Sequence, residues 1–418
     1  MDIKEVINRI LYYLIAAILV VNSQSIFVTI PNIMNKLTNI CMFGIVLVTF
    51  FIILLKGKYL KRNVFNTLII TLTLILYYGI YIIILPISFK RVVVLVTVAI
   101  CFLALYVLIS RDTLLKILEC YINIVVCIAI VSLIFWIFGS TLHVIGPSNM
   151  ITSNWTGDSS LKDVKSYMYV YFEPQYAQFM GHSVIRNSAI FAEGPMAAYN
   201  FSIALLSLIY MVDNKKRYKE WTLVFAILST ISATGISIVV ILGLIYWNKK
   251  KYKTIYGNII KFTGNIILIL ILLFIAYNIL SQKMQAYSGQ FRSNDITSTY
   301  YAWKENILFG TGLGNPNEIY KYFPYLRIKL QQFGLSTGLM TLLAEGGIYG
   351  ILPYIIVVIR NLSIFVRKSD LDILLVTGLI YYLWFMTYTP FQYINIIILI
   401  ILGSLHTENK VGAGEIEK

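Results

Sequence analysis

Residues 221–247 read WTLVFAILSTISATGISIVVILGLIYW, an apolar run with Ser and Thr at its centre. As one helix, it would place Lys215-Lys216-Arg217 and Lys249-Lys250-Lys251 on opposite sides of a membrane, whereas Lys and Arg of short loops concentrate on the cytoplasmic side. Two half-length helices that break near Ser229-Thr230 and Ser232-Ala233-Thr234-Gly235 would keep both clusters on one side. Broken backbone at membrane depth requires surrounding protein or a water-filled cavity. We therefore predict a broken span, with one long tilted helix as the alternative.

The rest of the chain extends this membrane pattern. Its 418 residues are 58% hydrophobic and 13% charged, with a mean hydropathy of +0.77, whereas soluble domains carry about 25% charged residues. We predict an all-α polytopic membrane protein, a single integral domain over 1–418. Apolar runs near the ~20 residues needed to cross a bilayer are 10–30, 38–55, 64–85, 92–109, 114–138, 195–212, 260–280, 338–359, 371–388 and a shorter run at 391–405.

With the two halves of 221–247, these runs give about 12 transmembrane helices and place both termini in the cytoplasm. Most of the 34 Lys and Arg residues then lie on the inner side. The net charge of +15 is spread over the ends of the spans and not gathered on one polar face, which argues against nucleic acid as a partner. The four cysteines lie in apolar runs without a CxxC pair, so the sequence indicates neither disulfides nor a metal site.

Two polar stretches interrupt the spans, at 139–193 and 281–337, and both are predicted to face outward. The first ends in Arg186 and Glu193, directly before the span that starts at Pro195. A carboxylate this close to hydrocarbon is costly unless it is paired or functional, and burial would raise its pKa toward that of a general base. Glu193 is our first candidate for the catalytic base, and His182 is the second. The alternative is a structural pair between Arg186 and Glu193.

The second stretch contains LFGTGLGNP, residues 308–316, in which Gly310, Gly312 and Gly314 alternate. Consecutive backbone N–H groups in such a loop can form a nest for an anion such as phosphate, and a plain glycine-rich turn is the alternative. Arg292 and Arg327 lie in the same stretch, and arginine suits a diphosphate because its planar fork donates two hydrogen bonds.

Aromatic residues are dense in both polar stretches. Tyr301 and Trp303 are candidates to stack on sugar rings, although tyrosines also form belts at any membrane interface. Farther along, Glu345 lies about two turns inside an apolar span, where a carboxylate needs a partner or a cavity. A hydrogen bond between helices across the small Gly346-Gly347 face is the alternative for this residue.

This order of features resembles the O-antigen ligase and Wzy-type polysaccharide polymerase superfamily. The similarity covers residues 221–405, with 186–195 as a second match, and its most specific part is the spacing of LFGTGLGN (308–315) from AEGGIYG (344–350). The resemblance implies a GT-C-like membrane glycosyltransferase. It also implies that outer-loop arginines bind the diphosphate of a polyprenyl-linked glycan, which maps here to Arg186, Arg292 and Arg327.

Two departures from the family pattern affect the assignment. Ser336-Thr337 stands where family ligases have a His-Asn pair, and Ala233 stands where many members have an arginine. The missing histidine favours a polymerase over a ligase and leaves the base unassigned.

The resemblance thus implies polymerisation of undecaprenyl-diphosphate-linked repeat units into a capsule, exopolysaccharide or O-antigen, by inverting transfer at the outer face of the bacterial cytoplasmic membrane. The implied partners are the lipid-linked glycan, membrane lipid, a flippase and a chain-length regulator, and no cofactor or metal is expected. Two alternatives remain: ligation of finished glycan to an acceptor, and transport of the lipid-linked unit. Transporters tend to have short loops and polar groups within the spans, unlike this chain.

Overall fold

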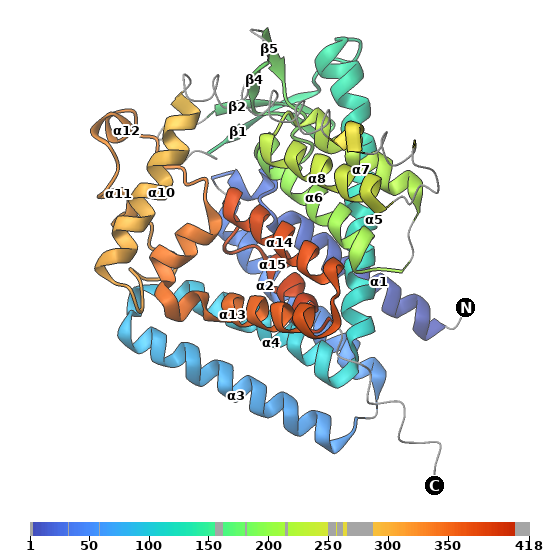
Figure 1. The fold of residues 1–418 in the computed structure, drawn as a ribbon, viewed down its shortest axis with the longest axis vertical. Coiled ribbons are helices and arrows are strands. Elements are labelled where there is room, and N and C mark those ends of the chain that lie inside the picture. The colour runs from blue at the N-terminus through green and yellow to red at the C-terminus, as the bar shows by residue number, and fades with distance from the viewer. Residues whose placement is uncertain are drawn as a thin grey trace.

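The computed structural model is mostly helical and describes residues 3–31, 33–57, 59–154, 162–179, 182–213, 216–249, 256, 262–265 and 287–405 (Figure 1). Among the described residues, six helical segments are long and apolar enough to cross a membrane: Ile3–Asn22, Lys36–Lys56, Lys61–Ile84, Pro86–Ile109, Arg111–Thr141 and Gly338–Lys368. Four shorter apolar helices are Gly194–Tyr210, Ala233–Lys249, Leu371–Met386 and Tyr393–Gly403. This composition is compatible with the polytopic membrane protein that the sequence predicts.

The elements of the first third are α1 (Ile3–Asn22), η1 (Ile26–Thr29), α2 (Met34–Lys56), α3 (Lys61–Ile84), η2 (Pro86–Ser88), α4 (Phe89–Ala104), η3 (Leu105–Ile109), α5 (Arg111–Phe135) and η4 (Trp136–Thr141). The C-terminal part contains α13 (Gly338–Lys368), α14 (Leu371–Met386) and α15 (Tyr393–Gly403). The first helix ends at Asn22, so the predicted first span, 10–30, is wrong at both ends. The helix stops there because Ser23 and Ser25 donate hydroxyl hydrogen bonds back to carbonyls of the last turn, and Gln24 adopts a φ of 57°.

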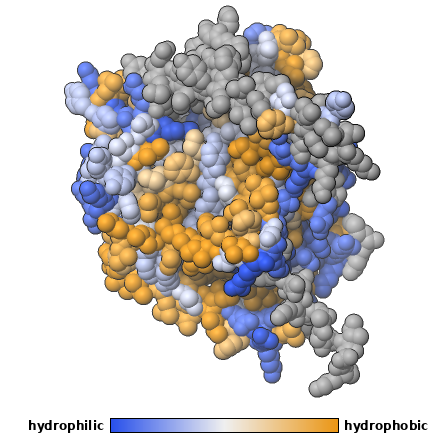
Figure 2. Space-filling view, in the orientation of Figure 1, coloured by the Kyte–Doolittle hydropathy of each residue, from blue (hydrophilic) through white to orange (hydrophobic). Residues whose placement is uncertain are grey.

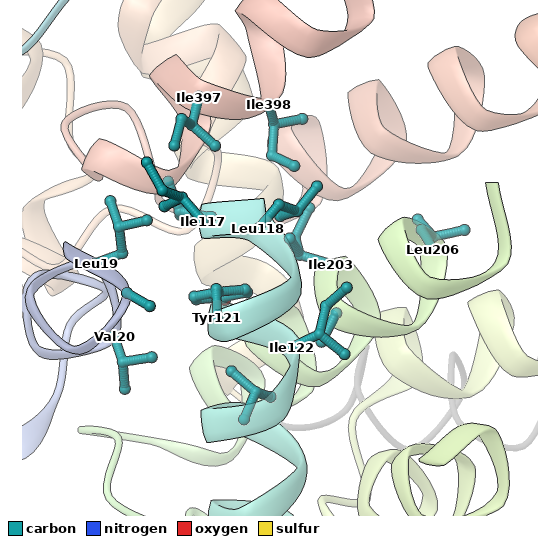
Figure 3. Packing of buried hydrophobic residues seen from close by; sticks show 14 of the residues in the cluster. Leu19, Val20, Ile117, Leu118, Tyr121, Ile122, Ile203, Leu206, Ile397 and Ile398 are labelled. Carbon is teal, nitrogen blue, oxygen red and sulfur yellow. The ribbon is translucent and has the colours of Figure 1, made fainter. Parts of the chain in front are cut away.

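Helix α5 forms the centre of the core. Figure 3 shows its Ile117, Leu118, Tyr121 and Ile122 facing side chains of three other helices. These partners are Leu19 and Val20 of α1, Ile203 and Leu206 of α6 (Gly194–Tyr210), and Ile397 and Ile398 of α15. Dispersion contacts in such a close-packed layer hold helices together even where lipid is the solvent. The core therefore joins the first, middle and last thirds of the chain.

Helix α3 lies at the edge of this bundle and exposes most of its apolar side chains, among them Leu68, Leu72 and Leu76. In Figure 2, orange residues form a broad zone on this face. It lies between bluish residues over the helices of 287–329 on one side and dark blue residues at the lower right. Exposed apolar surface of this extent is unusual for a soluble monomer. It suits contact with lipid.

The predicted break in 221–247 is confirmed. Helix α7 (Arg217–Ser229) and helix α8 (Ala233–Lys249) are separate, and Ile231 between them has a φ of 50°. The side chains of Ser229 and Thr230 bond to carbonyls one turn back, which satisfies the end of α7 locally. The single long helix is thus excluded. The predicted span at 260–280 lies outside the described residues except for 262–265.

The first polar stretch, 139–193, contains strands, so the all-α prediction is wrong here. Strands β1 (Asn149–Ser153), β2 (Lys162–Tyr167) and β3 (Tyr171–Glu173) form an antiparallel sheet in the order β1-β2-β3, and β4 (Tyr176–Phe179) pairs with β5 (His182–Ile185). Ile151, Val164 and Phe172, one from each strand of the three-stranded sheet, pack together with Ile26 of η1.

The second polar stretch, 281–337, is helical where it is described, with α10 (Tyr287–Glu305), α11 (Asn317–Tyr320) and α12 (Tyr325–Lys329). Figure 1 shows these helices at the left edge of the bundle, where α10 contacts α13. The first polar stretch reaches the α7–α8 break through Arg186, with which Arg292 of the second stretch interacts electrostatically, and the candidate site is built there.

Candidate functional site

Arg186 follows β5 and reaches the broken backbone between α7 and α8. Its Nη2 donates to the carbonyl of Ile231 at 2.9 Å. The segment is held there because the backbone N–H of the next residue, Asn187, donates to the Ser229 carbonyl at 3.1 Å. Gly194 permits this close packing, since a Cβ there would lie 3.2 Å from the Arg186 Cδ. The backbone exposed by the helix break thus binds the Arg186 guanidinium.

Gln175 connects Arg186 to Glu193. The Arg186 Nη1 lies 3.4 Å from the Gln175 Oε1, and the Gln175 Nε2 donates to the Glu193 Oε2 at 3.1 Å. Glu193 also precedes α6 (Gly194–Tyr210), and its carbonyl accepts from the N–H groups of the first turn. The Gln175 amide thus bridges Arg186 and Glu193, and it keeps the cation and the carboxylate in one polar group.

Arg292 reaches the same region from the first half of α10. Its Nη2 donates to the carbonyl of Met386, the last residue of α14, at 3.2 Å. Its charge also interacts with those of Glu193 and Arg186. Arg186 and Glu193 of the first polar stretch thus interact electrostatically with Arg292 of the second. The sequence predicted that Arg186, Arg292 and Arg327 would all converge.

Burial acts on both arginines. It lowers the pKa of the Arg186 guanidinium, the charge of Glu193 raises it, and the charge of Arg292 lowers it further. Burial also lowers the pKa of Arg292, which nearby Tyr382, Asp295 and Glu193 raise. Two positive charges close together in a partly buried place favour the binding of an anion there. In the described part of the chain, the Arg186 Nε is buried without a hydrogen-bond partner.

Four groups in this site escaped the sequence analysis: Gln175, Tyr382, Ser237 and the carbonyl of Ile231. The hydroxyl of Tyr382 lies 2.8 Å from the Ser237 Oγ, which connects α14 to the first turns of α8. A polar residue in the short connection between β3 and β4 and a tyrosine in an apolar helix carry no signal of their own. Only the folded contacts identify them.

Arg327 does not join this group. It is 2% exposed and forms an ion pair with Asp295, itself 1% exposed, at 2.6 Å. Its other guanidinium N–H groups donate to the carbonyls of Gln332, Phe291 and Gly334. The predicted role in diphosphate binding is therefore corrected to a structural one, because these contacts leave its charge enclosed by protein.

The loop with Gly310, Gly312 and Gly314 is not an open nest for a ligand. All three glycines have positive φ, but the N–H of Gly312 donates to the Glu345 carbonyl at 2.8 Å and that of Gly314 to the Glu345 Oε2 at 2.7 Å. The loop pairs with α13 at Gly347, whose φ of 62° interrupts that helix. The anion held by this loop is a carboxylate of the chain itself, so the prediction of diphosphate binding by these glycines is corrected.

The contact also explains the acid inside the apolar run. Glu345 is fully buried, and its Oε2 accepts a hydrogen bond from the Gly314 N–H. Tyr81 of α3 donates to the Glu345 carbonyl at 2.8 Å and completes the junction. Glu345 therefore fixes the position of the second polar stretch.

His182 is the first residue of β5 and pairs with Phe179, whereas Ile185 at the other end of that strand pairs with Tyr176. At ~3.3 Å per residue, its backbone lies about 13 Å along the chain from Arg186. The hairpin thus carries the backbone of His182 away from Glu193. Glu193 remains the candidate base that lies beside the arginines.

Tyr301 and Trp303 lie near the end of α10. Tyr301 is half exposed and stacks on Tyr322 with ring centroids 6.1 Å apart, and the Trp303 Nε1 donates to the Ile307 carbonyl. At 1.5 Å rise per residue, they lie about 14–17 Å along the helix from Arg292. Their stacking on sugar rings stays a prediction.

No protein-family model matches this sequence, and no curated protein matches it either.

Proposed function

We propose that this chain is a membrane glycosyltransferase that polymerises polyprenyl-diphosphate-linked repeat units, undecaprenyl-linked in bacteria, at the outer face of the cytoplasmic membrane. The observation that carries the proposal is the convergence of Arg186, Arg292 and Glu193 beside the α7–α8 break. A diphosphate is the anion that two adjacent guanidiniums suit best. Helix α8 begins at Ala233, next to this group, and a helix N-terminus favours a bound anion.

In the proposed reaction, a hydroxyl of one repeat unit attacks the anomeric carbon of the sugar on the other lipid. Glu193 accepts the hydroxyl proton, the bond from the anomeric carbon to the diphosphate oxygen breaks, and a new glycosidic bond forms with inversion. Arg186 and Arg292 stabilise the negative charge that builds on the leaving diphosphate. The products are a longer glycan on one carrier and free polyprenyl diphosphate.

The test is elongation of lipid-linked repeat units by the purified protein in detergent, read as the ladder of product lengths. Arg186→Ala and Arg292→Ala should each lower the rate by about 10²-fold or more, by analogy with removal of one preorganised charge donor. Lys329→Ala is the matched control, because Lys329 is an exposed cation in the same polar stretch. Normal yield and length from both arginine variants would exclude the clamp.

The same experiment separates the alternative functions. A carrier of lipid-linked units has no activity in detergent, where there are no two sides, so elongation there excludes transport. A ligase would leave the ladder unchanged and move finished glycan to an acceptor. In cells, loss of a polymerase leaves single repeat units, whereas loss of a ligase leaves full-length polymer on the carrier.

A further inference from the structure

The tip of the β2–β3 hairpin, Met168-Tyr169-Val170, combines backbone strain with exposed apolar side chains. Met168 has a φ of 51° and Tyr169 a φ of 59°. The left-handed conformation is unfavourable for residues other than glycine, asparagine and aspartate. The three side chains are 67%, 52% and 39% exposed. Glycine or asparagine would form this turn at lower cost, and polar residues would suit water better, so folding alone does not account for the sequence of the tip.

Contacts at the base of the tip fix its position against the end of the α5–η4 helix. The ring of Tyr167 packs on Gly139, where a Cβ would lie 2.8 Å from it, and lies 5.8 Å from the ring of Phe135. The N–H of Met168 donates to the Ser148 Oγ at 2.8 Å. The tip therefore has a fixed place beside this helix end.

That helix end is itself apolar on its surface. Exposed side chains there are Ile134, Ile137, Phe138, Leu142 and Val144. The helix, Arg111–Thr141, is one of the six segments that are long and apolar enough to cross a membrane. The apolar surface of a span thus continues onto the strained tip of a loop.

We propose that this tip inserts into the interfacial region of the bilayer leaflet on the side of the first polar stretch. Methionine and valine side chains gain from contact with acyl chains, and a tyrosine suits the headgroup level because its ring is apolar and its hydroxyl is polar. The partner is the lipid surface itself, and its contact with the tip offsets the strain in the turn.

Insertion would also set the height of the candidate site. The hairpin continues through β3 to Gln175, which bridges Arg186 and Glu193. An anchored tip would hold this bridge at the level of lipid headgroups, where the diphosphate of a lipid-linked substrate lies. This second consequence rests on the proposed function, whereas insertion of the tip does not.

The experiment measures the depth of a nitroxide label in full-length protein in nanodiscs of phosphatidylcholine and phosphatidylglycerol, without substrate. The label is placed by Tyr169→Cys, in a Cys127→Ser background that removes the exposed native thiol. Thr152→Cys is the control, because Thr152 is exposed on β1 and contacts Asp163 across the same sheet, far from the tip.

We expect the tip label to collide more with dissolved oxygen and less with an aqueous nickel complex than the control label does. Equal access to the nickel complex at both positions would place the tip in water and overturn the proposal. Val170→Cys repeats the measurement if Tyr169→Cys fails to elute as a folded monodisperse species. Because no substrate is present, the result is independent of whether the chain polymerises glycan.

Discussion

At the scale of single residues, the two kinds of buried arginine should respond differently to mutation. Arg327 is enclosed with Asp295, so Arg327→Ala would leave a buried, unpaired carboxylate. Removal of one partner of a buried pair costs about 3–5 kcal/mol. We expect a large drop in the unfolding temperature of Arg327→Ala in detergent and little change for Arg186→Ala. A stable Arg327→Ala protein with lost activity would return Arg327 to the site.

The pH profile of Arg186→Lys offers a second test at this scale. The unperturbed pKa of a lysine is about 10.4. Burial and the charge of Arg292 lower the pKa of the cation at this position, and the same effects would act on an ammonium. A lowered pKa means that the charge is lost as the pH rises through it. Elongation by Arg186→Lys should therefore decline at alkaline pH sooner than elongation by the parent protein, whose guanidinium stays protonated. Profiles that coincide at alkaline pH would show that this charge is not needed.

At the scale of elements, the junction between the glycine loop and α13 depends on close backbone contact. A Cβ at Gly347 would lie 2.4 Å from the Leu308 carbonyl oxygen, at a φ of 62°. Left-handed backbone alone costs about 1–2 kcal/mol for alanine, and the overlap adds to it. Gly347→Ala should lower the unfolding temperature and loosen the second polar stretch, which limited proteolysis would report.

Gly243→Ala is the control for this substitution. Gly243 lies inside α8 with nothing within 4 Å of a built Cβ, so alanine there should be neutral or stabilise by about 0.5–1 kcal/mol. If both substitutions had the same effect, the close contact at Gly347 would not be what holds the loop.

The elements also show what the sequence could predict. The two Lys/Arg clusters that flank 221–247 and the Ser/Thr residues near Ser229 predicted the helix break correctly, because both signals lie in or next to the segment itself. Arg186 and Glu193 are seven positions apart, just before the N-terminus of α6, so their proximity was predictable too. The bridge by Gln175 was not, since it depends on how β3, β4 and β5 turn back on themselves.

Two errors in the site have the same physical origin. The carboxylate that encloses Arg327 is Asp295, 32 positions earlier, and the acceptor for the glycine loop is Glu345, 31 positions after Gly314. The sequence does not distinguish an arginine that can bind a ligand from one that is paired with a buried carboxylate. It also does not distinguish a glycine loop open to a ligand from one whose N–H groups already bind a side chain of the protein. Only the tertiary partner separates them, and without it both were assigned to the ligand.

At the scale of the whole molecule, Arg186 and Arg292 can share one site only if both polar stretches lie on the same side of the membrane. We predict about 12 spans with both termini inside, so the exposed residues Asp163 and Lys329 would face outward, and the exposed residues Lys61 and Lys368 inward. Cysteines placed singly at these positions, in the Cys127→Ser background, would be labelled with a membrane-impermeant maleimide. Intact cells should label the first two, and only permeabilised cells the last two. Labelling of Lys61→Cys in intact cells would show that the orientation is the reverse of the predicted one. If only one of Asp163→Cys and Lys329→Cys were labelled in intact cells, Arg186 and Arg292 would lie on different sides of the membrane. That result would exclude a shared diphosphate site.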